Sequence, residues 1–139
     1  MRLIAVLTPA LISLSVTACG GGGGRKPTFP VTGSVLIDKK PGEYARVIFH
    51  PVNPEPGEVV RPQGLVKSDG TFTLTTYAEN DGAPAGDYLV TVQQYLAGRP
   101  DEGPKNHLPE KLAKPESSGL KAHVDAGPTT LQPFEVSKR

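Results

Sequence analysis

The stretch DYLVTVQQY, residues 87–95, is the part of the sequence that decides the fold. Its apolar and polar side chains alternate, with Tyr88, Val90 and Val92 on one side of an extended chain and Thr91 and Gln93 on the other. A period of two is that of a β-strand with one buried face. Turn-rich residues, 80–86, precede the stretch and a polar loop, 98–106, follows it. We therefore expect a strand with one face on a core and the other in water.

The preceding stretch GLVKSDGTFTLTTY, residues 64–77, has the pattern of a β-hairpin. Its centre, Ser68-Asp69-Gly70, contains an Asp-Gly step, which is among the strongest short-range signals of a hairpin turn. Phe72, Leu74 and Thr76 are expected to face inward. The sequence predicts that residues 64–67 and 71–77 pair with each other.

Similar alternation recurs in short stretches separated by proline and glycine. With those already described, these stretches predict seven strands: 29–38, 45–52, 64–67, 71–77, 87–95, 119–125 and 131–136. Residues 39–42 are predicted to be a turn, and residues 108–114 one helical turn that ends before Pro115. Seven short strands with turns between them indicate an all-β fold, a β-sandwich of the transthyretin-like or immunoglobulin-like kind.

The composition of the 139 residues fits one small domain and argues against nucleic acid as a partner. Proline (15) and glycine (16) are abundant, and there is no tryptophan. If Arg2 lies in a removed leader, 14 basic and 14 acidic side chains remain. Because basic and acidic side chains are equal in number, electrostatics gives no reason to expect binding to nucleic acid or polybasic binding to anionic lipid.

The first residues have the pattern of a secretory signal peptide. Met1-Arg2 is followed by a mostly apolar run, residues 3–16, which is shorter than the roughly 20 residues that span a bilayer. The next four residues, Val16-Thr17-Ala18-Cys19, resemble the lipobox of bacterial lipoproteins, and Cys19 is the only cysteine in the chain. That resemblance implies that residues 1–18 are removed and that Cys19 is the lipidation site, acylated with lipid chains such as palmitate.

A lipid-anchored chain has a predictable layout. Residues 19–28 are expected to be the lipidated cysteine and a glycine-rich tether, and residues 29–139 the sandwich domain. Two or more acyl chains anchor a protein stably. The expected location is membrane-anchored and extracytoplasmic, at the outer membrane and periplasm or the cell surface. Gly20 stands where an Asp would resemble an inner-membrane retention signal.

The order of the stretches resembles the carboxypeptidase regulatory-like domain, a transthyretin-like sandwich. The matching segments cover residues 29–136: VTGSVLIDKKP, ARVIFHPV, GLVKSDGTFTLTTY, GAPAGDYLVTV, SSGLKAHVDAG and PFEV. Two positions depart from the pattern, since Lys39 stands in the first turn, which usually reads D-G-K-P, and Tyr44 where a glycine is common. The resemblance implies a non-catalytic module. Some transthyretin-like proteins are hydrolases with a C-terminal Y-R-G-S signature, which this chain lacks.

The histidines and serines have no spacing typical of a metal or catalytic site. His50, His107 and His123 form no H-x₃₋₅-H pair, and no cysteine remains to join them. The serines considered as nucleophiles lie in strand or turn contexts without a G-x-S-x-G motif: Ser34, Ser68, Ser117 and Ser118. We expect no enzyme activity, no metal and no cofactor. The alternative is a small envelope metal-binding protein or hydrolase using His50 and His123, which could share one sheet face.

Two further kinds of residue are expected to have structural roles. Asp69, Asp81 and Asp87 lie in or beside turns, where aspartate bonds to nearby backbone, and no EF-hand-type calcium loop is present. Tyr88 is expected to be a corner tyrosine whose hydroxyl bonds to backbone close by. A protein or glycan partner of the envelope, if there is one, is expected at the loops 53–62 and 97–107.

Overall fold

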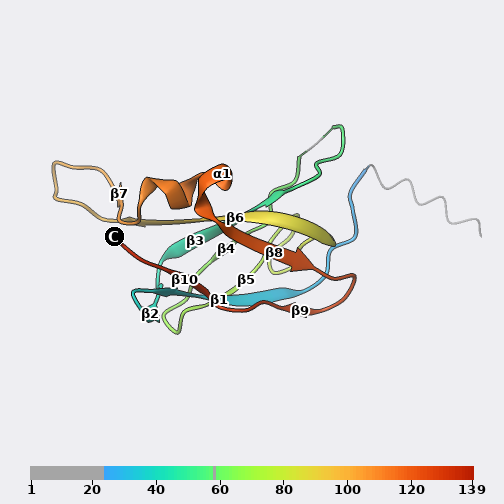
Figure 1. The fold of residues 1–139 in the computed structure, drawn as a ribbon, viewed down its shortest axis with the longest axis horizontal. Coiled ribbons are helices and arrows are strands. Elements are labelled where there is room, and N and C mark those ends of the chain that lie inside the picture. Colours follow the sequence, from blue (N-terminus) through green and yellow to red (C-terminus); the bar gives the residue numbers. More distant parts are fainter. Residues whose placement is uncertain (1–23, 58) are drawn as a thin grey trace, which may run out of the picture.

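Two five-stranded β-sheets lie one above the other in the computed structural model of the chain, which describes residues 24–57 and 59–139 (Figure 1). Helical structure in this part of the chain is confined to two short turns. The prediction of an all-β protein with packed sheets is therefore confirmed.

The first sheet is built around β1 (Val31–Ile37). Its neighbours run antiparallel or parallel to β1: β2 (Lys40–Pro41) and β5 (Thr71–Thr73) antiparallel, β9 (Thr129–Thr130) and β10 (Phe134–Val136) parallel. Every second residue of β1, beginning with Val31, is buried. The period of two in the sequence thus placed the correct face of β1 on the core.

The second sheet carries the longest strand. Its members are β3 (Ala45–Pro51), β4 (Gln63–Leu65), β6 (Gly86–Leu96), β7 (Lys105–Asn106) and β8 (Leu120–Val124), in the order β4-β3-β6-β7 with β8 also paired to β6. Strands β3 and β6 pair antiparallel over seven residues, with Val47 opposite Val92 and Phe49 opposite Val90. All four of these side chains are buried between the sheets.

Phe49 is the centre of the core. Its ring centroid lies 5.6 Å from that of Tyr88, 6.3 Å from that of Phe134 and 6.4 Å from that of Phe72. Close packing also explains Gly33, because a Cβ there would lie 2.6 Å from the Phe72 ring. Aromatic side chains from both sheets thus join the two layers.

The structure corrects the number and pairing of the predicted strands. Ten strands occur among the described residues rather than seven, because three two-residue strands, β2, β7 and β9, were not predicted. The predicted hairpin is divided between the sheets, since β4 pairs with β3 and β5 pairs with β1. The two halves bond to each other only near Lys67–Thr71 and at the bridge between Gln63 and Thr75. The main hydrogen-bonding partner of β4 is therefore in the second sheet, and that of β5 is in the first.

The turn after β1 is also shifted. Asp38 and Lys39 have positive φ, 50° and 66°, and form the turn, while Lys40 and Pro41 pair back onto β1 as β2. A two-residue turn with φ positive at both positions matches the twist of antiparallel strands. The sequence placed this turn one or two residues too late because Pro41-Gly42 is itself a turn signal.

Two short helical turns pack along β6, on the side of that strand away from β1 (Figure 1). They are the 3₁₀ turn η1 (Glu110–Ala113) and the α-helical turn α1 (Pro115–Ser118). Pro115 begins α1 rather than only ending the turn before it, as proline tolerates the first helical position. Thr91 lies on the outer face of β6 as predicted, but it is only 1% exposed, and its hydroxyl lies 3.0 Å from His50 Nε2.

Candidate functional site

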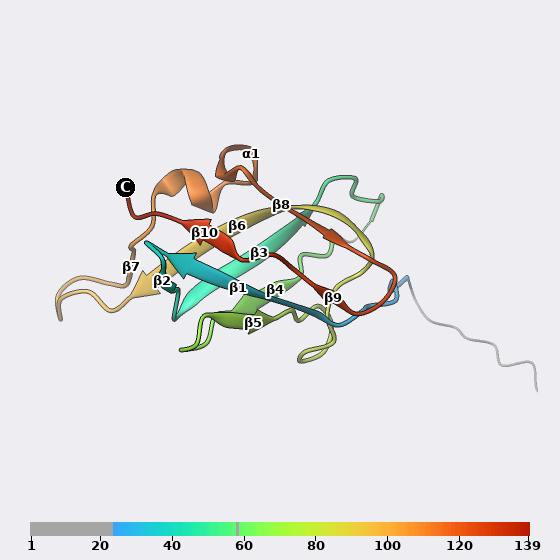
Figure 2. The same ribbon diagram turned by 60° about the horizontal axis from the view of Figure 1, so that its bottom comes forward.

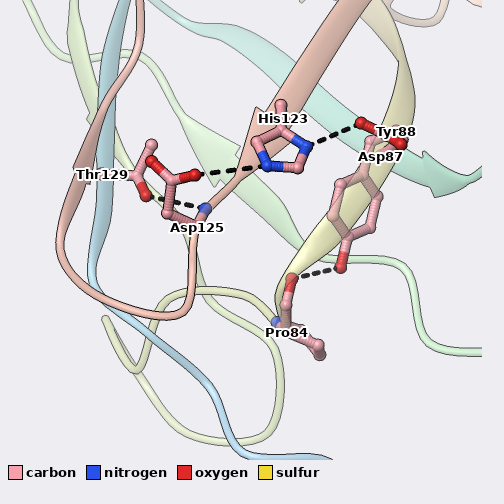
Figure 3. Close-up of polar contacts among 6 residues, drawn as sticks. All are labelled: Pro84, Asp87, Tyr88, His123, Asp125 and Thr129. Atoms are coloured by element: carbon pink, nitrogen blue, oxygen red, sulfur yellow. Dashed lines mark hydrogen bonds and ion pairs between the residues drawn. The ribbon is translucent and has the colours of Figure 1, made fainter.

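His123 forms the most concentrated polar cluster of the second sheet. It lies on β8 opposite Asp87 of β6, and its Nδ1 is 2.7 Å from Asp87 Oδ1 (Figure 3). On the other side of the ring, Nε2 is 3.2 Å from Asp125 Oδ1. Asp125 is held in turn by its backbone amide, which donates to Thr129 Oγ1 at 3.1 Å. The imidazole therefore bridges two carboxylates.

This arrangement stabilises the protonated ring. The hydrogen bond to Asp87, together with the charges of Asp87 and Asp125, raises the pKa of His123 above its usual value of 6.5, although desolvation acts in the opposite direction. Both ring nitrogens face carboxylates, and no serine hydroxyl hydrogen-bonds to the ring in the described part of the chain. The cluster is suited to linking β6 to the end of β8. With carboxylates at both ring nitrogens and no serine hydroxyl bonded to the ring in the described part of the chain, the cluster is not arranged as a Ser-His-Asp triad.

The other two histidines lie apart from this cluster. His50, on β3, is half-buried, with Nε2 3.0 Å from Thr91 Oγ1, and burial and the Arg61 charge lower its pKa. His107 is exposed in a loop. The register puts His50 and His123 on the same sheet face, as the sequence suggested, but β6 lies between them. Among residues 24–57 and 59–139, no group of three His, Cys, Asp or Glu side chains could hold a metal ion.

Tyr88 has the role predicted for it. Its ring is 4% exposed and packs on Phe49, and its hydroxyl donates to the Pro84 carbonyl at 2.7 Å (Figure 3). Burial raises the pKa of Tyr88 to about 12, with a smaller contribution from Tyr77. The hydroxyl is therefore a permanent donor that fixes the corner leading into β6.

Two of the three turn aspartates, Asp69 and Asp81, bond to nearby backbone as expected, whereas the carboxylate of Asp87 bonds to His123 instead. Asp69 Oδ1 accepts from the amide and hydroxyl of Thr71, at 3.0 and 2.7 Å, and these bonds lower its pKa. Asp81 accepts from the amides of three successive residues beginning at Thr76, at 2.6, 2.9 and 3.0 Å. Burial acts to raise the pKa of Asp81, and hydrogen bonds from these three amides and from its own amide together lower it by more. Both carboxylates hold turns in place.

A pocket of about 530 Å³ lies beside Tyr88, at the end of the molecule where the described chain begins. The Pro-rich loop after β3 forms one wall, including Pro54 and Glu55. The segment before β1 closes it, because Lys26 Nζ is 2.9 Å from Glu55 Oε1 and Arg25 stacks on Tyr77 at 5.1 Å. Thus residues 25 and 26, within the expected tether, contact the domain.

A second hollow, a shallow groove of about 590 Å³, lies on the outer face of β4, β3 and β6. It is lined by Tyr44, Arg46, Leu65, Gln93, Tyr95 and Pro104. Only Pro104 comes from a loop named in the sequence analysis as a partner site. The sequence placed Gln93 on the outward face of its strand, but it did not show that three strands bring these residues together. The sequence signal that could have indicated this groove is a pair of tyrosines, Tyr44 just before β3 and Tyr95 near the end of β6.

Cys19 and the expected leader, residues 1–18, lie outside the described residues. Within the described part, no helix is long and apolar enough to cross a membrane.

Comparison of the chain with protein-family models, with curated proteins and with solved structures finds no match. The fold itself defines the class of the protein, which is an all-β protein of two packed sheets.

Proposed function

We propose that the chain is a bacterial lipoprotein, acylated at Cys19, whose domain serves as a non-catalytic binding or structural module at the cell envelope. The observation that carries this proposal is Val16-Thr17-Ala18-Cys19 after a short apolar run, with the only cysteine of the chain at its last position. Small side chains before the cysteine fit a signal-cleavage site, and a single cysteine has no disulfide partner within the chain.

The beginning of the folded part supports an anchor at this position. Arg25 and Lys26 contact Tyr77 and Glu55, and Phe29 is bridged to Ala83. Between Cys19 and Arg25 lie five glycines, whose full extension reaches about 20 Å. A domain tethered in this way stays close to the bilayer surface, with the Tyr88 pocket at the end of the domain where the tether begins.

The domain is further proposed to be transthyretin-like, of the carboxypeptidase regulatory-like kind. Support comes from the two positions that depart from that pattern. Lys39, in the first turn, and Tyr44, where a glycine is common, have φ of 66° and 65°. Left-handed backbone is what glycine adopts readily. The backbone at both positions is thus compatible with the glycines that the pattern carries.

Mass spectrometry of the mature N-terminus, combined with membrane fractionation, tests the anchor. The full-length precursor is produced in a bacterial host that processes lipoproteins. We expect a mature chain that begins at Cys19, carries the mass of the attached acyl chains, and sediments with the membranes. The variant Cys19→Ser should remain unacylated and leave the membrane fraction.

A matched control separates the motif from the thiol. The double variant Cys19→Ser/Gly21→Cys keeps one cysteine but moves it two residues beyond the motif, and it should behave like Cys19→Ser. Acylation of the double variant, an unmodified Cys19 in the parent protein, or retention of residues 1–18 would each contradict the proposal. Metal analysis of the same preparations tests the competing metal-carrier hypothesis, which requires a stoichiometric ion lost in His50→Ala/His123→Ala.

A further inference from the structure

The groove on the outer face of the second sheet combines apolar and hydrogen-bonding side chains in an ordered array. Arg46 of β3 is paired with Leu65 of β4 on one side and with Gln93 of β6 on the other, so these three side chains form a row across the sheet. Tyr44 and Tyr95 lie next to this row, before the beginning of β3 and near the end of β6. The array is thus a row of one apolar, one charged and one polar side chain beside two aromatic rings.

Its apolar members are unusually exposed. Tyr44, Leu65 and Tyr95 are 59%, 58% and 56% exposed, and they are three of the five large apolar side chains with high exposure in the described part of the chain. Single exposed apolar residues are ordinary on protein surfaces, whereas a cluster with polar surroundings marks a binding surface. Exposure here is concentrated in one groove.

Tyr44 is held there at a conformational cost. Its φ of 65° is left-handed, a region that is costly for an aromatic L-residue. Three hydrogen bonds impose this backbone: Tyr44 N to Val66 O, Ala45 N to Gly42 O, and Gln94 Nε2 to Glu43 O, at 3.1, 3.0 and 2.8 Å. The Tyr44 ring is mostly exposed, so burial of apolar surface does little to offset this conformational cost. Strain maintained by surrounding structure around an exposed side chain points to a function for that side chain.

Arg46 determines the charge that the groove accepts. It is the only side chain of the groove that carries a full charge at neutral pH, and no carboxylate pairs with it among residues 24–57 and 59–139. Its planar guanidinium is suited to bind a carboxylate with two parallel hydrogen bonds. A hydrogen bond to Glu43, and then the charge of that carboxylate, raise the pKa of the Tyr44 hydroxyl, so Glu43 lies next to the groove.

The main chain at the centre of the groove, on β3 and β6, is already hydrogen-bonded, whereas β4, which carries Leu65, is an end strand of this sheet. Arg46 and Gln93 belong to the continuous ladder between β3 and β6, so a ligand over this face meets side chains and not free backbone groups. An extended peptide that adds a strand requires a free sheet edge. A ligand made of rings that carry hydroxyl and carboxylate groups suits this face. Its rings can pack on the two tyrosines, and its polar groups can bond to the guanidinium and the amide.

We propose that this groove binds an acidic glycan, a polysaccharide chain whose sugars carry carboxylates. Sugar CH faces pack on Tyr44 and Tyr95, the Arg46 guanidinium binds a carboxylate, and the Gln93 amide bonds to a hydroxyl. This inference deepens the proposed binding role by naming the class of partner.

The position of the groove agrees with that role. Strand β3 begins and β6 ends at the end of the sandwich where β7 lies, whereas the described chain starts at the opposite end (Figures 1 and 2). If Cys19 is anchored, the groove is on the side of the domain away from the bilayer. There it can reach polymers of the envelope.

Calorimetric titration of the mature full-length protein, in detergent micelles, tests the inference. The probes are oligogalacturonate, which carries a carboxylate on every sugar, and neutral cello-oligosaccharide of equal length. We expect oligogalacturonate to bind at least tenfold more tightly than the neutral chain. Arg46→Gln should weaken oligogalacturonate binding at least tenfold, because a hydrogen bond to a charged group is lost. Tyr95→Ala should weaken it about three- to tenfold.

Matched variants separate the groove from general effects. Tyr95→Phe keeps the ring and should bind within about twofold of the parent. Arg61→Gln removes the same charge outside the groove and should also change affinity by less than about twofold. Glu43→Gln removes a carboxylate next to the groove and should tighten binding about twofold.

Three results would overturn the inference: no binding of oligogalacturonate, equal binding by Arg46→Gln, or tighter binding of an acidic proline-rich peptide than of the glycan. The last result would identify a protein partner, because aromatic grooves also accept polyproline segments. The titration does not depend on acylation, since an unacylated protein is measured without detergent. Its failure is thus distinguishable from failure of the anchor.

Discussion

Each end of the sandwich carries a tyrosine and a basic side chain of the second sheet, but these side chains have partners at one end and, in the described chain, are exposed or without an ion pair at the other. At the end where β6 begins, Tyr88 is buried and bonded to Pro84, and His123 is flanked by Asp87 and Asp125. At the end where β6 stops, Tyr95 is exposed and Arg46 is without an ion pair in the described chain. Polar groups that satisfy each other build structure, whereas those left to solvent remain available to a ligand. At the first end these side chains therefore have structural roles, and the second end carries the proposed binding surface.

Replacement of the buried tyrosine should have the largest effect on stability. We expect Tyr88→Ala to lower the free energy of unfolding by about 3–5 kcal/mol, because an aromatic side chain is lost from the core. Tyr88→Phe should cost about 1 kcal/mol, the contribution of the hydrogen bond to Pro84. Urea denaturation measures both. Tyr95→Ala, at the other end, should change stability by less than about 0.5 kcal/mol, and a larger loss there would contradict the comparison.

Replacement of the strained tyrosine should act in the opposite direction. Tyr44→Gly should raise the free energy of unfolding by about 1 kcal/mol, since relief of the left-handed strain exceeds the entropy that glycine adds to the unfolded chain. The same variant should weaken oligogalacturonate binding. Tyr44→Ala is the control, because it removes the ring but keeps the strained backbone and should gain no stability. Equal stability of the Gly and Ala variants would show that Tyr44 is not strained.

The carboxylates around His123 make a smaller, pH-dependent contribution. Because the pKa of His123 is raised in the folded state, protonation stabilises the fold fully below the unfolded pKa of about 6.5. That stabilisation is lost as the pH rises through the higher folded pKa. The stability difference between the parent and His123→Gln should therefore be larger at pH 5.5 than at pH 8.5.

NMR titration checks the cause of this effect. The His123 ring should titrate above 6.5 in the parent protein, and Asp87→Asn should bring its pKa down, since Asp87 makes the largest contribution. His107→Gln, which changes an exposed loop residue, should alter stability little at either pH. A His123 pKa at or below 6.5 would exclude the carboxylate bridge in solution.

The ion pair between the first described residues and the Pro-rich loop should matter least. Lys26 and Glu55 are largely exposed, and exposed pairs contribute about 0–1 kcal/mol. We expect Lys26→Gln to lower the free energy of unfolding by less than about 0.5 kcal/mol in urea denaturation. A loss above 1 kcal/mol would mean that this segment belongs to the cooperative core.

Local chemistry allowed much of the fold to be predicted from sequence. The alternation in β1, β3 and β6 identified their buried faces, Asp69-Gly70 marked a turn, and the corner role of Tyr88 followed from its place after a turn. These features depend on residues close together in the chain. The candidate groove was not predicted, because Tyr44, Arg46 and Tyr95 are brought together by pairing across β3 and β6.

The sequence by itself determined which segments are extended, which side of each strand is apolar, and where Cys19 stands relative to a signal-like leader, because periodicity and motif are properties of neighbouring residues. The tertiary structure alone decided that β4 and β5 join different sheets, that Thr91 is buried although it lies on an outer face, and that His123 lies between two carboxylates. Those outcomes depend on which distant strands satisfy each other's backbone hydrogen bonds, and a local pattern carries no information about that choice.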